Sequence, residues 1–353
     1  MEERLSLTWK GRLIAIIIGF VLFMLAAEAV LRVAMPHWQE YYSGWFMRAI
    51  NVAGHGRVST GQPGFDGYFA QNNGDFRIHI NINEFGLRNN EPVDEADGRI
   101  WVVGDSMTFG WGVEENQIYA SVIGDKLGSP TYNIASPGTD VCGYQALLAR
   151  MPESVQPRAV VMGLILENDI HVYDCREKAR REDSQSLDAK PTNTSLIAIK
   201  SWFTGHSAIY NFVAVSLKRV NVLREVLTSL GIVRPIDTYK NPLLGLDFEK
   251  AIQRSVAEIE TLKKMIPEGT PFLVVIAPGR FELNGGDELY ARLRKAMGTA
   301  LGERGIDYVD PFEAFNEAGY APTHFAHDGH WTVLGHRLAG TVAAKRLRTL
   351  LAP

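Results

Sequence analysis

The stretch AVVMGLIL, residues 159 to 166, is an unbroken apolar run of the kind that forms a β-strand buried on both faces. Four more short apolar segments recur along the chain: RIWVVG at 99–104, TYNIA at 131–135, PFLVVIAP at 271–278 and IDYVDP at 306–311. Helix-like patterns fill most of the gaps, and this alternation predicts right-handed crossovers onto a parallel sheet. The expected fold class is therefore α/β, with a doubly wound, mainly parallel sheet flanked by helices.

Composition limits the classes of protein to consider. The chain has 353 residues and 46% hydrophobic content, which is enough for a full core. Lys and Arg total 36 against 40 Asp and Glu, a net charge of −4. This balance gives no electrostatic reason to expect a nucleic-acid partner, so small or glycan-like partners are favoured.

The N-terminal region carries a candidate membrane span. Residues 13–27 contain no charge, and apolar character resumes to Met35, so we predict a transmembrane anchor at 13–35. Glu28 and Arg32 interrupt it one helical turn apart, where they can pair near the lipid headgroups. The span therefore predicts a bilayer partner for this part of the chain.

The charges around this span predict its orientation. Basic residues in the segment 1–12 place that segment in the cytoplasm, and the rest of the chain would be periplasmic or extracellular at the cell membrane. The alternative is a cleaved signal peptide, because Ala27-Glu28-Ala29 has the small-x-small form of a cleavage site.

Beyond the span, we expect an irregular juxtamembrane lead-in at 36–98 and one α/β domain at 99–353. The domain is interrupted at about 176–250. Charged residues from 176 onward predict a mobile surface loop, and helix-like spacing follows at 196–231 and 247–266. This helical insertion is expected to be a lid or a docking face for a protein partner.

Polar residues follow three of the predicted strands. Ser106 lies in GDSMTFGWG at 104–112, Gly138 follows the second strand, and Asn168 follows the third. Parallel strands present their carboxyl ends at one edge of a sheet, where ligands bind, so these residues should converge. The backbone N–H groups of Ser106 and Gly138 and the amide of Asn168 would then form a three-donor oxyanion hole.

A base for the serine is found near the C-terminus. HFAHDGHWTVLGHRLAG, residues 324–340, places Asp328 and His330 on one short loop ahead of a final helix. They offer an orienting carboxylate and a general base. Each block has a structural explanation by itself, since Asp105-Ser106 would make an ordinary helix N-cap. Their joint occurrence at strand ends favours catalysis.

The four blocks in this order resemble the SGNH hydrolases, also called the GDSL esterase/lipase family. The resemblance implies a flavodoxin-like three-layer domain with Ser106 as nucleophile, Gly138 and Asn168 as oxyanion donors, and His330 and Asp328 as base and orienter. The last block, D-x-H-W at 328–331, is similar to that of polysaccharide O-acetyltransferases.

Two positions depart from the family pattern. Leu166 stands where the third block usually has glycine, and the last pair is usually spaced D-x-x-H. The second departure leaves His327 and His336 as alternative bases.

These residues predict a membrane-anchored extracytoplasmic serine esterase or O-acyltransferase acting on acyl esters, most simply acetyl esters, of cell-envelope or exported glycans. The alternatives are a lipid or thioester hydrolase of the same fold, and a non-catalytic membrane-tethered assembly factor for polysaccharide export. No cofactor or metal is predicted, because the late histidines lack cysteine or clustered glutamate partners.

The only two cysteines, Cys142 and Cys175, each follow a candidate active-site block on strands expected to be near neighbours. We predict a disulfide between them, since both chain segments leave at the same sheet edge. The alternative is a pair of free thiols.

Overall fold

The computed structural model describes residues 8–71, 74–188, 194–219, 229 and 247–352. The chain forms two compact units. One unit combines residues 1–42 with 193–233, and the other combines residues 43–192 with 234–353. The larger unit contains every predicted site residue.

The larger unit is built on a five-stranded sheet with the order β6-β5-β7-β8-β9. All of its pairings are parallel. Its strands are β5 (Ile100–Val103), β6 (Thr131–Asn133), β7 (Ala159–Ile165), β8 (Phe272–Ala277) and β9 (Asp307–Val309). All five lie where apolar runs predicted strands. Because β6 and β7 lie on opposite sides of β5, the strand order reverses at β5, which is where α/β sheets form ligand crevices.

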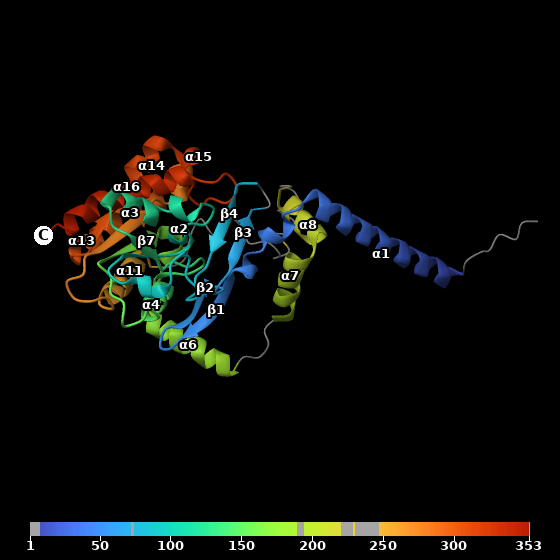
Figure 1. Cartoon of the computed structure of the whole chain (residues 1–353), viewed down its shortest axis with the longest axis horizontal. Helices are drawn as coiled ribbons and strands as arrows, with labels where there is room; N and C mark the ends of the chain where they lie inside the picture. The colour runs from blue at the N-terminus through green and yellow to red at the C-terminus, as the bar shows by residue number, and fades with distance from the viewer. Residues whose placement is uncertain (1–7, 72–73, 189–193, 220–228, 230–246, 353) are drawn as a thin grey trace, which may run out of the picture. The chain divides into compact units, whose positions relative to one another are not determined.

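Helices cover both faces of this sheet, as Figure 1 shows. On one face, the alternate strand residues Val103, Val160 and Val274 pack with α4, α11 and α13. On the other face, Val102 and Val161 pack with α3 and α16. Side chains alternate across a strand, so both sets being fully buried confirms the predicted three-layer α/β fold.

The helices of this unit have the following bounds: α2 (Ser106–Phe109), α3 (Tyr119–Leu127), α4 (Val141–Ala149), α5 (Leu166–Asp169), α6 (Cys175–Asp188), α11 (Phe248–Lys263), α12 (Arg280–Gly285), α13 (Glu288–Glu303), α14 (Phe312–Ala318), α15 (Tyr320–Thr323) and α16 (Val333–Leu350). Short 3-10 turns occur at η2 (Ser43–Trp45), η3 (Val93–Ala96) and η4 (Glu115–Gln117).

Two antiparallel hairpins precede the sheet, where an irregular lead-in was expected. They pair β1 (Met47–Val52) with β2 (Gly56–Gly61), and β3 (Asp66–Ala70) with β4 (Arg77–Asn81). The second hairpin contributes to a separate apolar cluster. The segment FRIHINI at 76–82 has a strand-like sequence and contains β4, but the Gly- and Asn-rich composition around it favoured irregular structure overall. The pairing of these short strands depends on packing rather than on a strong local pattern.

The predicted surface loop after residue 176 is instead the helix α6. Its sequence has no apolar period, but Arg, Glu, Lys and Ala are strong helix formers. Asp174 Oδ1 accepts a hydrogen bond from Glu177 N at 3.0 Å, and Glu177 pairs with Arg181 one turn later. The N-terminal cap and the helix propensity of these residues are therefore sufficient to form α6 without an apolar periodicity. The predicted amphipathic helix at 247–266 corresponds to α11, whereas most of 220–246 lies outside the described residues.

The smaller unit contains α1 (Trp9–Ala34), η1 (Trp38–Tyr41), α7 (Thr194–His206) and α8 (Ala208–Arg219). The most apolar window of α1 has a mean hydropathy of 2.7, and no residue in that window is buried. By length and composition this helix can cross a membrane, and a signal sequence would meet the same criterion.

Candidate active site

Ser106 lies at the tight turn between β5 and α2. Asp105 caps α2, because its Oδ1 accepts a hydrogen bond from Met107 N at 2.9 Å. Gly104 is required before it, since a Cβ there would lie 2.0 Å from Thr108 Oγ1. A Cβ at Gly163 of β7 would lie 2.3 Å from the same hydroxyl oxygen, so glycine is needed there as well. The two glycines let α2 approach the sheet closely and fix the position of Ser106.

Ser106, His330 and Asp328 form one hydrogen-bonded chain. His330 Nε2 lies 2.8 Å from Ser106 Oγ, and His330 Nδ1 bonds the Asp328 carboxylate. The residues come from opposite ends of the domain, 224 positions apart in the case of Ser106 and His330. This arrangement allows a neutral imidazole to take the serine proton while the carboxylate holds the other ring nitrogen.

The carboxylate of Asp328 has a second partner that the sequence did not indicate. Gln71 Nε2 donates to Asp328 Oδ2 at 2.8 Å. Burial alone would raise the pKa of Asp328, but the hydrogen bonds and charge of His330 outweigh it and lower this pKa below its ordinary value. Asp328 therefore stays ionised at neutral pH, as an orienting group requires.

The connection between β3 and β4 holds the loop that carries this pair. Asp75 accepts hydrogen bonds from His327 N at 3.0 Å and binds His327 Nδ1 at 2.7 Å. Phe76 packs against Phe325, with ring centroids 5.2 Å apart. Together with Gln71, these contacts fasten the loop of Asp328 and His330 to the hairpin. No local pattern could have identified them, because each depends on a contact about 250 positions away in sequence.

The alternative bases have other environments. His327 binds Asp75 and is largely exposed. His336 is fully buried, accepts a hydrogen bond from Tyr119 N at 3.2 Å, and burial lowers its pKa to about 3. Among the three candidates, only His330 has a described hydrogen bond to Ser106.

Asn168 lies beside the serine turn. Its Nδ2 donates to Asp105 Oδ2 at 2.6 Å, which fixes the side-chain amide and leaves its second N–H available to a ligand. Burial raises the pKa of Asp105, and the bonds from Met107 and Asn168 oppose this rise. Gly138 follows β6 with φ of 73°, a left-handed conformation that favours glycine.

The turn that carries Asn168 forms without the glycine usual in the third block. Leu166 is fully buried in the core. Asp169 Oδ2 accepts hydrogen bonds from Ile165 N at 2.7 Å and Tyr144 Oη at 3.0 Å. Burial, and next the charge of Asp105, raise the pKa of Asp169 well above its ordinary value. A buried polar cluster thus supports this turn.

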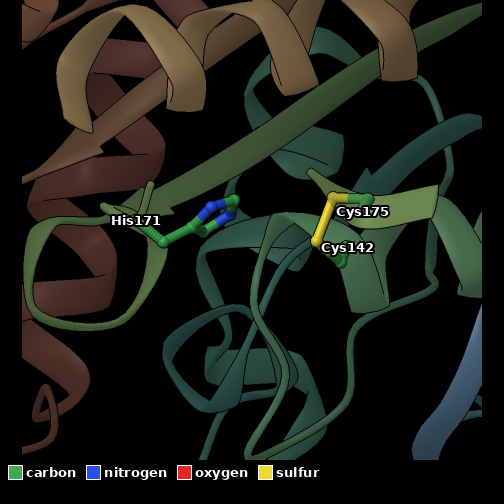
Figure 2. A group of neighbouring side chains, drawn as sticks. All are labelled: Cys142, His171 and Cys175. Atoms are coloured by element: carbon green, nitrogen blue, oxygen red, sulfur yellow. A yellow bond between two sulfur atoms is a disulfide. The ribbon is translucent and has the colours of Figure 1, made fainter. Parts of the chain in front are cut away.

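Cys142 and Cys175 form a disulfide, with 5.1 Å between their Cα atoms. Figure 2 shows the bond with the ring of His171 pointing toward it. The two sulfur atoms and a ring nitrogen lie within 4.8 Å of one another. Because the sulfurs are bonded to each other, His171 alone of this group retains a ligand atom. Burial lowers the pKa of His171 to about 4.

A hollow of about 350 Å³ lies beside Gly138 and Asn168. Its lining is mostly polar and carries charges of both signs. The lining residues are His55, Arg57, Val58, Ser59, Gly138, Thr139, Asp140, Cys142, Gly143, Glu167, Asn168 and Lys178. Two of its lining residues, Gly138 and Asn168, are the candidate oxyanion donors.

No protein-family model matches this chain, and no curated protein matches it. Solved structures do match. A lipolytic protein of the G-D-S-L family from Veillonella parvula is 14% identical with a TM-score of 0.38, covering 70% of this chain and 96% of its own. A carbohydrate esterase family 2 enzyme from Myceliophthora fergusii is 16% identical with a TM-score of 0.41, covering 72% of this chain and 66% of its own.

A family two carbohydrate esterase from Clostridium thermocellum is 11% identical with a TM-score of 0.39. The match covers 74% of this chain and 66% of that one. On the five-stranded parallel sheet of this chain, a Gly-Asp-Ser turn follows β5, an Asn-Asp turn follows β7 and an Asp-x-His pair precedes α16. This is the order of blocks by which the chain resembles the SGNH hydrolases.

Proposed function

We propose that this protein is a membrane-anchored, extracytoplasmic serine esterase or O-acyltransferase acting on acyl esters of glycans, with acetyl as the simplest acyl group. The observation that carries the proposal is the hydrogen-bonded chain from Ser106 through His330 to Asp328, at the switch point of the sheet. Gly138 and Asn168, which we propose as oxyanion donors, border the adjacent hollow.

The first half of the reaction forms an acyl-enzyme. Ser106 Oγ attacks the ester carbonyl carbon while His330 Nε2 takes the hydroxyl proton, and Asp328 stabilises the resulting imidazolium. Negative charge on the carbonyl oxygen is held by N–H groups of Ser106, Gly138 and Asn168. The C–O bond of the ester then breaks, and the departing alcohol takes the proton from His330.

The second half removes the acyl group. A hydroxyl acceptor attacks the acyl-serine and transfers its proton to His330, and Ser106 leaves with that proton. Water as acceptor gives hydrolysis, and a sugar hydroxyl gives transfer. Both outcomes use the same residues.

The lining of the hollow favours a glycan over a lipid. Side chains such as Arg57, Asp140, Glu167 and Lys178 suit a substrate rich in hydroxyl groups. A long acyl chain would instead need a continuous apolar wall. The O-acetyltransferase subgroup remains part of this proposal through the D-x-H-W block at 328–331.

A fluorophosphonate probe tests the proposal directly, because it labels an activated serine and not an ordinary one. We expect labelling of the folded full chain, loss of labelling in Ser106→Ala, and unchanged labelling in Ser154→Ala, a variant of an exposed serine. Folded protein that does not label would support the assembly-factor alternative. Mass spectrometry of an acetylated oligosaccharide incubated with the enzyme would then separate free acetate from an acetylated acceptor.

A further inference from the structure

A carboxylate within the apolar helix α1 joins it to the helices of the insertion. Glu28 Oε1 accepts hydrogen bonds from Arg32 Nε at 2.8 Å and Ala208 N at 2.9 Å. Glu28 Oε2 accepts from Ser207 Oγ and Ile209 N, both at 3.0 Å. The predicted pair with Arg32 is therefore present, and Glu28 also caps α8.

Arg32 completes this junction from the same side of α1. Its Nη2 donates to the carbonyl of His206, the last residue of α7, at 2.9 Å. Its guanidinium also lies 4.9 Å from the ring centre of Trp38. Glu28 and Arg32 are thus satisfied where α7 and α8 meet, and the three helices belong to one compact unit (Figure 1).

Large apolar side chains of α7 and α8 face outward. Trp202 is 56% exposed and Phe212 is 48% exposed, and Ile199, Phe203 and Val213 are exposed as well. Ile199, Trp202 and Phe203 have the i, i+3, i+4 spacing of a single helix face.

One polar side chain of the same helix pair, that of Asn211, faces inward. Asn211 is buried, and its Nδ2 donates to the carbonyls of Thr204 at 2.7 Å and Ser207 at 3.0 Å. In a water-soluble pair of helices, amide side chains are usually exposed and phenylalanine side chains are usually buried. Asn211 and Phe212 show the reverse. Lipid-facing helices show this inversion, because lipid does not penalise exposed apolar groups and backbone polar atoms must be satisfied internally.

We propose that α7 and α8 form a membrane-contacting hairpin that embeds the face carrying Ile199, Trp202, Phe203, Phe212 and Val213 in the bilayer beside the Glu28–Arg32 end of α1. The proposal rests on α1 being a membrane anchor. The bilayer is the occupant that the structure favours, because Glu28 and Arg32 join α7 and α8 to α1, a candidate membrane span whose apolar window has no buried residue. Aromatic residues such as Trp202 are also common at the membrane interface.

Site-directed fluorescence on the full chain in phospholipid nanodiscs tests this proposal. Both native cysteines are in the disulfide, so one introduced cysteine is the sole reactive thiol. We would label Trp202→Cys and Phe212→Cys separately with an environment-sensitive fluorophore. Phe20→Cys on α1 reports the anchor, and Tyr308→Cys, an exposed position on β9, reports an aqueous surface. Activity of each variant on p-nitrophenyl acetate verifies the fold.

We expect nitroxide-labelled lipid to quench the fluorophore at positions 202 and 212 several-fold more than iodide does. Position 20 should give the same result. Position 308 should be quenched more by iodide than by the labelled lipid. If positions 202 and 212 behave like 308 while 20 is quenched by lipid, the hairpin proposal is wrong and the anchor stands. If position 20 is also quenched by iodide, the anchor itself is wrong and the hairpin proposal fails with it. Shielding of 202 and 212 from both quenchers would assign the face to a protein partner or a second copy and overturn the proposal.

Discussion

Gln71 donates a hydrogen bond of 2.8 Å to Asp328, so a hairpin residue holds the carboxylate that orients the candidate catalytic histidine. The two residues are 257 positions apart. The hairpin β3–β4 is therefore part of the candidate active site. Its other contacts, from Asp75 and Phe76, reach the same loop that carries Asp328 and His330.

Replacing Gln71 with alanine should lower kcat for p-nitrophenyl acetate while changing KM little. A hydrogen bond to a charged group contributes about 1.5 kcal/mol, which corresponds to about tenfold in rate if the bond is needed in the transition state. Gln253→Ala, which changes a glutamine on α11, is the matched control and should keep full activity. A Gln71→Ala enzyme with raised KM and unchanged kcat would place Gln71 in substrate binding instead.

Ser106→Ala and His330→Ala should each reduce esterase activity by about three orders of magnitude or more, because the serine and its base act as a unit. His327→Ala should retain activity within about tenfold, since the backbone N–H of His327 still binds Asp75. Rates measured on all three purified variants check the assignment. An inactive His327→Ala beside an active His330→Ala would reverse it.

Asn168→Ala should lower kcat about a hundredfold with little change in KM, as expected for a donor that acts on the transition state. Asp105 fixes the Asn168 amide through the 2.6 Å bond, so Asp105→Asn should impair the same step. In the double variant the two losses should be less than additive, because both act through one side chain. Fully additive losses would show that Asp105 acts independently of Asn168.

The sheet and its site edge were predictable from sequence for a physical reason. Strands such as Ala159–Ile165 are buried on both faces and must be continuously apolar, so each leaves an unambiguous pattern. Their carboxyl ends then locate Ser106, Gly138 and Asn168 without further information. The structure brings Ser106, His330 and Asp328 together as the sequence predicted.

The remaining features depend on interactions that leave no local pattern. Gln71 and Asp75 are ordinary polar residues until the chain folds. The helix α6 is stabilised by propensity, capping and the Glu177–Arg181 pair, and an argument from apolar periodicity misses it. The link from Glu28 to Ser207 spans 179 positions, and only the structure reveals it.

The Cys142–Cys175 disulfide should stabilise the folded domain. The two residues are 33 positions apart, and in the chain-entropy model closing a loop of that size contributes about 3 to 4 kcal/mol. The double variant Cys142→Ser, Cys175→Ser should therefore have a free energy of unfolding that is lower by about 3 to 4 kcal/mol. Urea unfolding of both proteins measures this difference. Alkylation and mass spectrometry of non-reduced wild-type protein should detect no free thiol. Two alkylated cysteines would show that the bond does not form in the native compartment.

Asp140, two residues before Cys142 of the disulfide, should make the free energy of unfolding depend on pH. Its carboxylate caps α4 through Gly143 N at 3.0 Å, binds Lys178 Nζ at 2.8 Å, and accepts a bond from the Tyr173 hydroxyl. Burial alone would raise the pKa of Asp140, but the charge and hydrogen bond of Lys178, with the other two donors, lower it overall. The ionised form is therefore preferred in the folded state.

A lowered folded-state pKa stabilises the protein above the unfolded pKa of aspartate, about 3.9, and this contribution disappears as pH falls through the folded value. Asp140→Asn should consequently reduce the free energy of unfolding by about 1 to 2 kcal/mol at pH 7. The difference from wild type should shrink steadily below about pH 4, since wild-type Asp140 then becomes neutral as well. Urea unfolding of both proteins at a series of pH values measures this difference. Asp247→Asn, the equivalent cap of α11, controls for the loss of a capping charge alone. A difference that stays constant down to pH 3 would mean that the carboxylate charge of Asp140 contributes nothing to stability.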